Sequence, residues 1–232
     1  MQNLESPAFV RPAKFDCNLN AEDVTCSPIG SLVARRAVYS RKAVAWISAR
    51  AWRTDMKPSD VRALKAAKQN VDPVVIARAA IEVAALAKML FGALPGFMVS
   101  TVAVGHSRRP DSFSVRLAAA VAKRLELPFE KLFADRHVSG VSHPKELKKL
   151  PPLQRLTTPT ANVLLVDDVA TSGWHIEEAV NDLRGCGVAC FAVSWISGTV
   201  IGEGASKPQL VDFGLPALPA SMRRTARLAL GS

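Results

Sequence analysis

Runs of apolar residues alternate along the chain with amphipathic stretches, in the order expected of an α/β protein. The plainest run is Val-Leu-Leu-Val at residues 163–166, which predicts a strand buried on both faces. Apolar runs at 97–104 and 188–196 predict two further strands. Buried strands of this kind belong to parallel sheets covered by helices. We therefore expect an α/β fold with a mainly parallel central sheet flanked by helices.

Three helices are predicted, one before these strands and two between them. The clearest begins at Asp72-Pro73, where Asp72 can cap the first turn and Pro73 suits the first helical position, and it closes at Gly92. Residues 115–125 predict a second helix. Apolar residues at helical spacing from Ile176 onwards predict a third, directly after the strand at 163–166.

Other segments are less clearly patterned. Residues 58–69 predict a short basic helix, and residues 129–133 predict a short strand. The segment 31–54 fits a hairpin or an amphipathic helix, and its periodicity does not decide between them.

Candidate chemistry lies where the strand at 163–166 ends. Asp167 and Asp168 come first, then the small polar residues Thr171, Ser172 and Gly173, then a helix start. Hydroxyls, a glycine and the unpaired N–H groups of a helix start form a site for an anion such as phosphate. Two carboxylates would repel that phosphate unless they bind sugar hydroxyls or Mg²⁺. A sugar phosphate meets these requirements together.

The sequence Asp-Asp-Val-Ala-Thr-Ser-Gly-Trp-His at residues 167–175 resembles the phosphoribosyl-pyrophosphate (PRPP) loop of type I phosphoribosyltransferases, usually Asp-Asp-x-x-Thr-Thr-Gly-x-Thr. The resemblance implies the type I phosphoribosyltransferase fold and a PRPP site that uses Mg²⁺. It implies that Asp167 and Asp168 are the catalytic acids, which hold the ribose hydroxyls and the metal. The residues implied to cradle the 5′-phosphate are Thr171, Ser172, Gly173, Trp174 and His175.

Two positions depart from the family pattern, and a third bears on the choice of base. Trp174 is bulky at a variable position, and His175 stands where a threonine hydroxyl usually meets the phosphate. Thr171 stands where the 6-oxopurine enzymes carry an aspartate, which argues against a hypoxanthine or guanine enzyme.

Adjacent acids after a buried strand also occur in response-regulator receivers and in dehalogenase-type phosphatases, and a coincidental turn is a further alternative.

A second loop of the family would follow the strand at 97–104. There Ser107, Arg108 and Arg109 are candidate pyrophosphate ligands, similar to the basic loop of the ComF-like branch, and a solvated basic turn is the alternative.

Residues 135–160 match the position of the family's flexible catalytic loop, or a plain linker. Its candidate charges are Lys145, Lys148, Lys149 and Arg155. Trp195 and Phe213 are either base contacts or core residues.

The resemblance suggests three parts of the chain: an N-terminal basic extension or hood at 1–69, a phosphoribosyltransferase-type α/β domain at 70–215, and a basic tail at 216–232. The implied activity is a glycosyltransferase reaction of nucleotide metabolism. Ribose 5-phosphate would move from PRPP to an unidentified nitrogen acceptor, a nucleobase or similar small molecule, with release of pyrophosphate. Because dimers are frequent in the family, a homodimer is compatible with this assignment.

The charge distribution supports a rival function. The net charge is +10, and residues 35–68 hold ten Lys or Arg against Asp55 and Asp60, interleaved with Tyr39, Trp46 and Trp52. Phosphate neutralisation combined with base stacking is typical of nucleic-acid binding. The alternative is therefore a regulator on the same fold, which senses PRPP or a nucleotide or binds nucleic acid without turnover.

The N-terminal residues, the apolar stretches and the cysteine spacing predict the cellular compartment of the protein and the redox state of its thiols. The first residues lack the basic and apolar regions of a signal peptide, and no apolar stretch without charges is long enough to span a membrane. We expect a cytoplasmic protein that makes no membrane contact. The four cysteines form no Cys-x-x-Cys pair and are expected to be reduced thiols.

Overall fold

A computed structural model of the chain describes residues 37–51, 58–103, 111–136, 151–198 and 209–210. All of them belong to one compact unit, Leu19–Leu210. The second unit combines Met1–Asn18 with Val211–Ser232 and lies outside the described residues.

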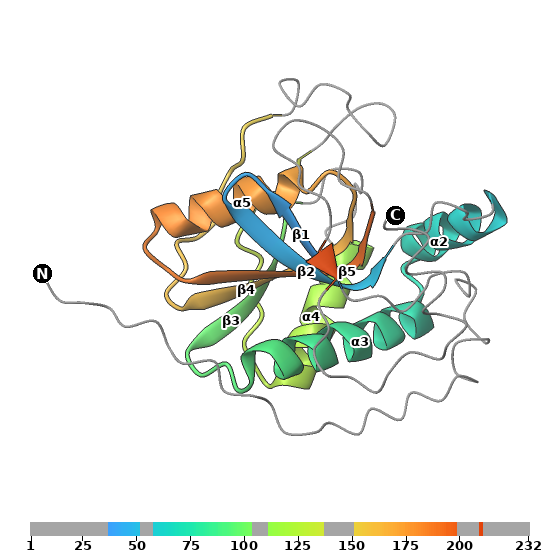
Figure 1. Cartoon of the computed structure of the whole chain (residues 1–232), viewed down its shortest axis with the longest axis horizontal. Coiled ribbons are helices and arrows are strands. Elements are labelled where there is room, and N and C mark those ends of the chain that lie inside the picture. The colour runs from blue at the N-terminus through green and yellow to red at the C-terminus, as the bar shows by residue number, and fades with distance from the viewer. Residues whose placement is uncertain (1–36, 52–57, 104–110, 137–150, 199–208, 211–232) are drawn as a thin grey trace, which may run out of the picture. The chain divides into compact units, whose positions relative to one another are not determined.

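The described unit is built on a six-stranded sheet (Figure 1). Its strands are β1 (Ala37–Arg41), β2 (Val44–Ala51), β3 (Phe97–Thr101), β4 (Asn162–Ala170), β5 (Cys190–Ser197) and β6 (Gln209–Leu210). They lie in the order β3-β4-β5-β2-β1-β6, in which β3, β4, β5 and β2 are mutually parallel and β1 is antiparallel to both of its neighbours. The predicted fold class, a mainly parallel sheet flanked by helices, is confirmed.

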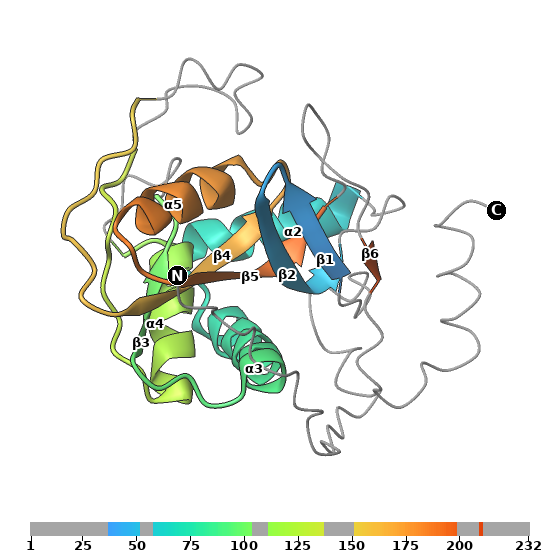
Figure 2. The ribbon, with the colours of Figure 1, turned by 60° about the vertical axis from the view of Figure 1, so that its left-hand side comes forward.

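Helices cover both faces of the sheet. They are α2 (Pro58–Asn70), α3 (Pro73–Phe91), α4 (Phe113–Leu125) and α5 (Trp174–Gly185). α3 and α4 pack against each other and against one face, whereas α5 packs against β2, β4 and β5 on the other (Figures 1 and 2). Residues 163–166 of β4 are fully buried between these layers, as their apolar run predicts.

The helix starts follow the capping residues in the sequence. The Asp72 side chain accepts hydrogen bonds from the backbone N–H groups of Val74 and Val75, and Gly92 closes α3. Ser112 caps α4 in the same way by accepting from the Val115 N–H group. Both helices begin within two residues of their predicted starts because the caps are local signals.

Two strand predictions need correction. β4 does not stop before the paired acids but continues to Ala170, because β5 keeps pairing alongside it, with Asp167 opposite Ser194 and Ala170 opposite Ser197. Residues 129–133 do not form a strand. Phe129 makes one isolated bridge to Val99 of β3, and Phe133 makes another to Arg155.

The ambiguous segment before residue 54 contains a hairpin, with β1 and β2 joined by the two-residue turn Lys42-Ala43. β2 inserts beside β5, so the sheet extends into the segment that the sequence analysis assigns to the N-terminal extension. The boundary at residue 70 itself stays a prediction. Tyr39 and Trp46 stack on each other in the core, which removes both from the aromatic residues available to stack on nucleic-acid bases.

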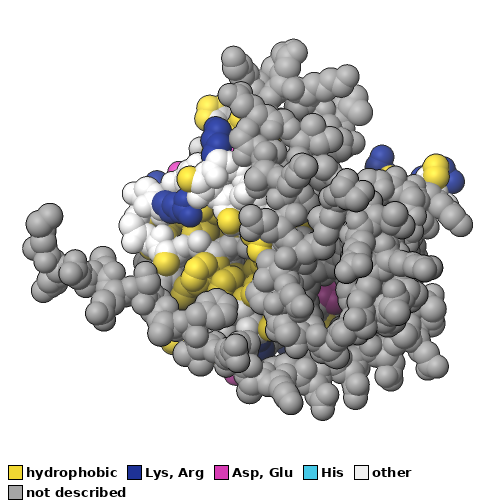
Figure 3. Space-filling model, viewed as in Figure 1, with side chains coloured by type: hydrophobic (Ala, Val, Ile, Leu, Met, Phe, Trp, Pro, Cys, Tyr) yellow, Lys and Arg dark blue, Asp and Glu magenta, His cyan; other side chains and the backbone are white. Residues whose placement is uncertain are grey.

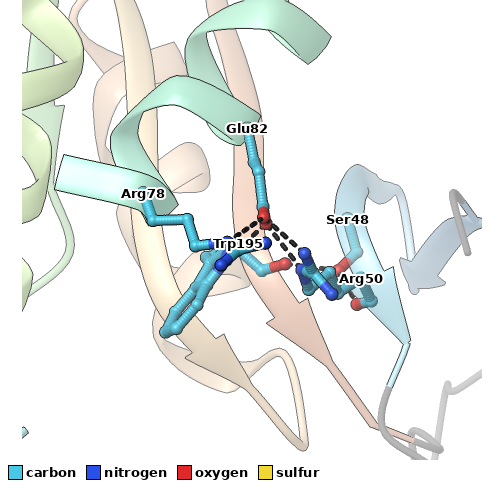
Figure 4. A network of polar contacts seen from close by, with 5 residues as sticks. All are labelled: Ser48, Arg50, Arg78, Glu82 and Trp195. Carbon is cyan, nitrogen blue, oxygen red and sulfur yellow. Dashed lines mark hydrogen bonds and ion pairs between the residues drawn. The ribbon is translucent and has the colours of Figure 1, made fainter. Parts of the chain in front are cut away.

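A buried polar network ties α3 to the sheet (Figure 4). The Glu82 carboxylate accepts hydrogen bonds from the Arg50 guanidinium of β2 and from Trp195 Nε1 of β5, the latter at 2.9 Å. Arg78 adds a longer ion pair at 3.8 Å. Trp195 is therefore a core residue in this structure, and Phe213 lies outside the described residues.

Hydrophobic side chains are visible at the surface on the side of the molecule where β3 and β4 lie (Figure 3). One exposed aromatic residue is Phe191, at 39% exposure, whose ring stacks with those of Phe91 and Phe97. These residues lie near the amino ends of β3 and β5, opposite the carboxyl ends that carry the paired acids. Within the described ranges, no helix is both long and apolar enough to cross a bilayer.

Removing the Glu82 carboxylate should destabilise the fold strongly. Glu82→Ala leaves the Arg50 guanidinium buried without its acid, and the free energy of unfolding should fall by about 3–5 kcal/mol. Chemical denaturation followed by circular dichroism measures this loss. The matched control is Asp111→Asn, which removes a carboxylate from an exposed ion pair with Arg116 and should cost less than about 1 kcal/mol. Equal losses in the two variants would contradict the role of the buried network.

Candidate functional site at the carboxyl end of β4

The paired acids lie buried near the carboxyl end of β4, an interior strand between β3 and β5. Asp167 is 7% exposed and Asp168 is 5% exposed. Asp168 Oδ2 lies 2.8 Å from Lys68 Nζ, and its Oδ1 accepts a hydrogen bond from the Val169 N–H group at 2.7 Å. A lysine from the last turn of α2 thus supplies the counter-charge for this strand.

The two carboxylic acids have different pKa values because their surroundings differ. Burial, and then the negative charge of Asp168, raise the pKa of Asp167 to about 7. Burial alone would also raise the pKa of Asp168, but the charge and hydrogen bond of Lys68, together with the Val169 N–H group, lower it. Burial disfavours the charged form of Lys68, yet the neighbouring carboxylates outweigh this effect and raise the pKa of Lys68. Near neutral pH, Asp168 and Lys68 therefore form an ion pair beside an acid that gains or loses its proton.

The loop after β4 leads into α5 without a side-chain cap. Gly173 is the N-cap residue, its carbonyl accepts the Glu177 N–H group at 2.8 Å, and as a glycine it has no side chain to cap the first turn. Gly173 is in the left-handed conformation at φ 71°, and Trp174 after it is helical. Consecutive left- and right-handed residues turn their N–H groups towards one side, which makes a concavity for an anion. The dipole of α5 favours negative charge at the same place.

Trp46 of β2 fixes the back of this loop. A Cβ atom added to Gly173 would lie 2.2 Å from Cη2 of the Trp46 ring. Trp46 is itself held by its Nε1 group, which donates to Ser197 Oγ at 3.0 Å, and by its stack with Tyr39. Only glycine fits between this ring and the loop.

The predicted phosphate cradle, residues 171–175, is therefore one continuous strand–loop–helix junction next to the acids, and its role as a binding site stays a prediction. The proposed pyrophosphate ligands Ser107, Arg108 and Arg109 lie outside the described residues, as do Lys145, Lys148 and Lys149. Arg155 contacts Asp182 at 3.7 Å and the Cys186 thiol, near the far end of α5. It is therefore not beside the acids, as a charge of the catalytic loop would be.

Sequence reasoning missed the residues that reach this junction from elsewhere in the chain. Lys68 and Arg41 counted only as charges of the basic segment, and Trp46 as a candidate stacking residue. Arg41 is 2% exposed and contacts both the loop and α5. No local signal distinguishes Arg41 and Lys68 from solvated basic residues. Their partners, Glu177 and Asp168, are a hundred or more residues away in the sequence.

The donor set fits Mg²⁺ only in part. Magnesium prefers oxygen ligands and is commonly held by one or two carboxylates together with phosphate oxygens of a substrate. Asp167 and Asp168 provide that number, although Lys68 already pairs with Asp168. Among the described residues no group of three or more His, Cys, Asp or Glu could hold a metal by itself. A metal here would need oxygens from the ligand.

Comparison with known proteins gives similarity at the level of solved structures. No family model and no curated protein matches the chain. An orotate phosphoribosyltransferase from Aeropyrum pernix is 22% identical, with a TM-score of 0.36, over 76% of this chain and 79% of that one. An adenine phosphoribosyltransferase is 12% identical, with a TM-score of 0.40, over 74% of this chain and 89% of that one.

A UMP synthase from Leishmania donovani is 16% identical, with a TM-score of 0.35; the match covers 60% of this chain and 24% of that one. Phosphoribosyltransferases are thus among the solved structures that resemble this chain. At these identities and TM-scores the likeness carries no weight for activity, and the function has to be argued from the residues of this chain.

Asp167 should make stability fall with rising pH. Its pKa is higher in the folded chain than in the unfolded chain, so the folded state binds more protons between the ordinary carboxyl pKa and about 7. The free energy of unfolding should fall by up to about 1.4 kcal/mol per pH unit across that window and level off above it. Asp167→Asn, which cannot ionise, should remove this part of the slope.

Urea unfolding at about pH 5 and about pH 8 measures the difference between the two proteins. Asp135→Asn, at a partly exposed ion pair with Lys131, is the control and should keep the wild-type slope. If Asp167→Asn has the same slope as the wild type, Asp167 is not protonated in the way its burial requires.

A side chain at position 173 should disrupt the loop. Gly173→Ala places a methyl group against Trp46 and forces a left-handed conformation on alanine, so the free energy of unfolding should fall by about 2–4 kcal/mol. Gly185→Ala on the same helix meets open space and should be close to neutral. Adding Trp46→Phe to Gly173→Ala should restore part of the loss, because it relieves the clash and leaves the backbone strain. No restoration would show that the ring is not the obstacle.

Proposed function

We propose that the chain is a phosphoribosyltransferase that binds PRPP with Mg²⁺. It transfers ribose 5-phosphate to a nitrogen acceptor of nucleobase type and releases pyrophosphate. The observation that carries this proposal is the junction itself, in which two buried acids near the carboxyl end of an interior parallel strand are followed within a few residues by a helix start whose N-cap is a glycine. Ligands of open α/β sheets bind outside the carboxyl ends of the strands.

The acids are suited to hold the sugar. A carboxylate accepts hydrogen bonds from two neighbouring hydroxyl groups, which a ribose ring offers. Lys68 keeps Asp168 ionised and therefore able to accept, since it lowers the pKa of that acid. Asp167, with its pKa near 7, can accept as a carboxylate or donate as an acid. The pair therefore provides both kinds of hydrogen bond to the sugar hydroxyls.

The helix start is suited to hold the 5′-phosphate. The N–H groups that converge at Gly173 and Trp174 donate to phosphate oxygens, and the hydroxyl groups of Thr171 and Ser172 add two more donors. His175 takes the place of the usual threonine, and its ring nitrogen can also donate. Bound this way, the phosphate fixes the distance of the ribose from the acids and orients its anomeric carbon.

Mg²⁺, held by Asp167, Asp168 and the oxygens of PRPP, would supply positive charge against the departing pyrophosphate. Ser107, Arg108 and Arg109 are proposed to add forked donors to the same group.

Calorimetric titration with PRPP and Mg²⁺ tests binding, and the release of pyrophosphate with each of a panel of nucleobases tests turnover. The double variant Asp167→Asn, Asp168→Asn should bind PRPP at least about 100-fold more weakly, since it loses two charge-assisted hydrogen-bond acceptors. Asp111→Asn should bind as the wild type does. Absence of wild-type binding, with the chain shown to be folded, overturns the proposal.

The same experiment distinguishes the enzyme from the alternative, a regulator on the same fold without turnover. Binding of PRPP with no pyrophosphate release for any acceptor would assign a sensor or regulator, an alternative favoured by His175 in place of threonine. The case for nucleic acid is weaker than the basic segment suggests. Arg41, Arg50 and Lys68 are paired with acids inside the described unit, and Trp46 is buried. Gel shifts at two salt concentrations test this binding directly.

A further inference from the structure

Arg41, the last residue of β1, makes three contacts at the start of α5. Its Nε group donates to Glu177 Oε2 at 2.8 Å, and its NH1 group donates to the Ser172 carbonyl at 3.3 Å. Its guanidinium carbon lies 4.1 Å from the centroid of the Trp174 ring. The Arg41 side chain is thus held by the Glu177 carboxylate, the face of the Trp174 ring and the Ser172 carbonyl.

The contact with Ser172 has a consequence for the next residue. A trans peptide is planar, with its C=O and N–H groups pointing in opposite directions. The described peptides are all trans. Arg41 holds the Ser172 carbonyl towards the hairpin, so the N–H group of Gly173, in the same peptide, points away from the hairpin. This N–H group is the first of those that converge at the left-handed Gly173. Arg41 therefore sets the direction of a phosphate donor that it does not touch.

The surrounding charges keep Arg41 in place. Glu177 is buried, and both Arg41 and the exposed Lys42, at 3.1 Å, pair with it. Two cations against one carboxylate leave an excess positive charge beside the loop, which favours a bound anion. Trp174 provides the flat face on which the guanidinium rests. This contact gives a physical role to the bulky side chain at the variable position of the motif.

The geometry points to Arg41 as a positioning residue for the 5′-phosphate site. It locks the Ser172–Gly173 peptide with the carbonyl turned away from the phosphate and the Gly173 N–H group turned towards it. Without this hold the peptide can flip, which would place a carbonyl oxygen against the anion. The inference rests on the proposed phosphate site, but it concerns the orientation of the loop and requires no turnover.

The decisive variants remove or weaken the contact between Arg41 and the Ser172 carbonyl without leaving a buried charge unpaired. Arg41→Met with Glu177→Gln removes both charges and the contact to Ser172. Arg41→Lys keeps a charge for Glu177 but loses the fork that reaches two acceptors at once. Arg184→Ala is the matched control, because Arg184 links α5 to the same hairpin through the Ala43 carbonyl, at 3.2 Å, without touching the loop.

The measurement is a titration with ribose 5-phosphate, and in parallel with inorganic phosphate, on protein labelled with ¹⁵N at glycine. In the wild type and in Arg184→Ala, the Gly173 amide resonance should shift on binding. In the double variant and in Arg41→Lys, affinity for both probes should fall at least about tenfold, and the Gly173 shift should shrink. Thermal unfolding monitors folding, and a purely structural role would lower the melting temperature without changing the Gly173 response.

The outcomes separate this inference from the proposed function. Phosphate binding that depends on Arg41, in a protein that does not bind PRPP, would support the inference and overturn the function. Full PRPP affinity in a folded double variant would overturn the inference and leave the function standing. A folded wild type that binds neither PRPP, ribose 5-phosphate nor inorganic phosphate would overturn both.

Discussion

Buried charges must be paired, and this requirement fixes the position of the basic N-terminal segment. Each described basic side chain that this segment buries meets an acid from a later element: Arg41 pairs with Glu177, and Arg50 pairs with Glu82. Lys68 meets Asp168 in the same way. An unpaired charge in the interior costs several kcal/mol, so each pair favours the position in which the segment meets its acid. The positive charge that the sequence concentrates before residue 69 is in part the internal counter-charge of the acids that follow.

Two side chains of the N-terminal segment also constrain the loop between β4 and α5. Trp46 closes one side of the loop and admits only glycine at position 173, while Arg41 holds the carbonyl of Ser172. Both residues come from the β1–β2 hairpin, which joins the sheet through the parallel pairing of β2 with β5. Backbone N–H groups bind an anion well only when they are oriented beforehand, because reorientation would take free energy from binding. In the proposed site, the hairpin would provide this orientation through Trp46 and Arg41.

The two acids illustrate how one strand end can present different chemistry from neighbouring residues. Asp168 is held ionised by Lys68, whereas Asp167, buried beside it, keeps its proton up to about pH 7. The pair therefore carries less negative charge than two free carboxylates would, which would reduce its repulsion of the phosphate that we propose to bind at the start of α5. The two acids are thus compatible with the anion site that the sequence predicts directly after them.

The sequence by itself determined the elements whose signals are local. The apolar run at 163–166 gave a buried parallel strand, Asp72 gave the start of α3, and the continuity of residues 167–175 placed acids, loop and helix start together. Tertiary structure decided the rest. Pairing with β5 extended β4 through the acids, and pairing with β1 and β5 made residues 44–51 a strand. The roles of Arg41, Trp46 and Lys68 depend on partners far along the chain, and a basic or aromatic residue carries no local mark that tells a buried, paired position from a solvated one.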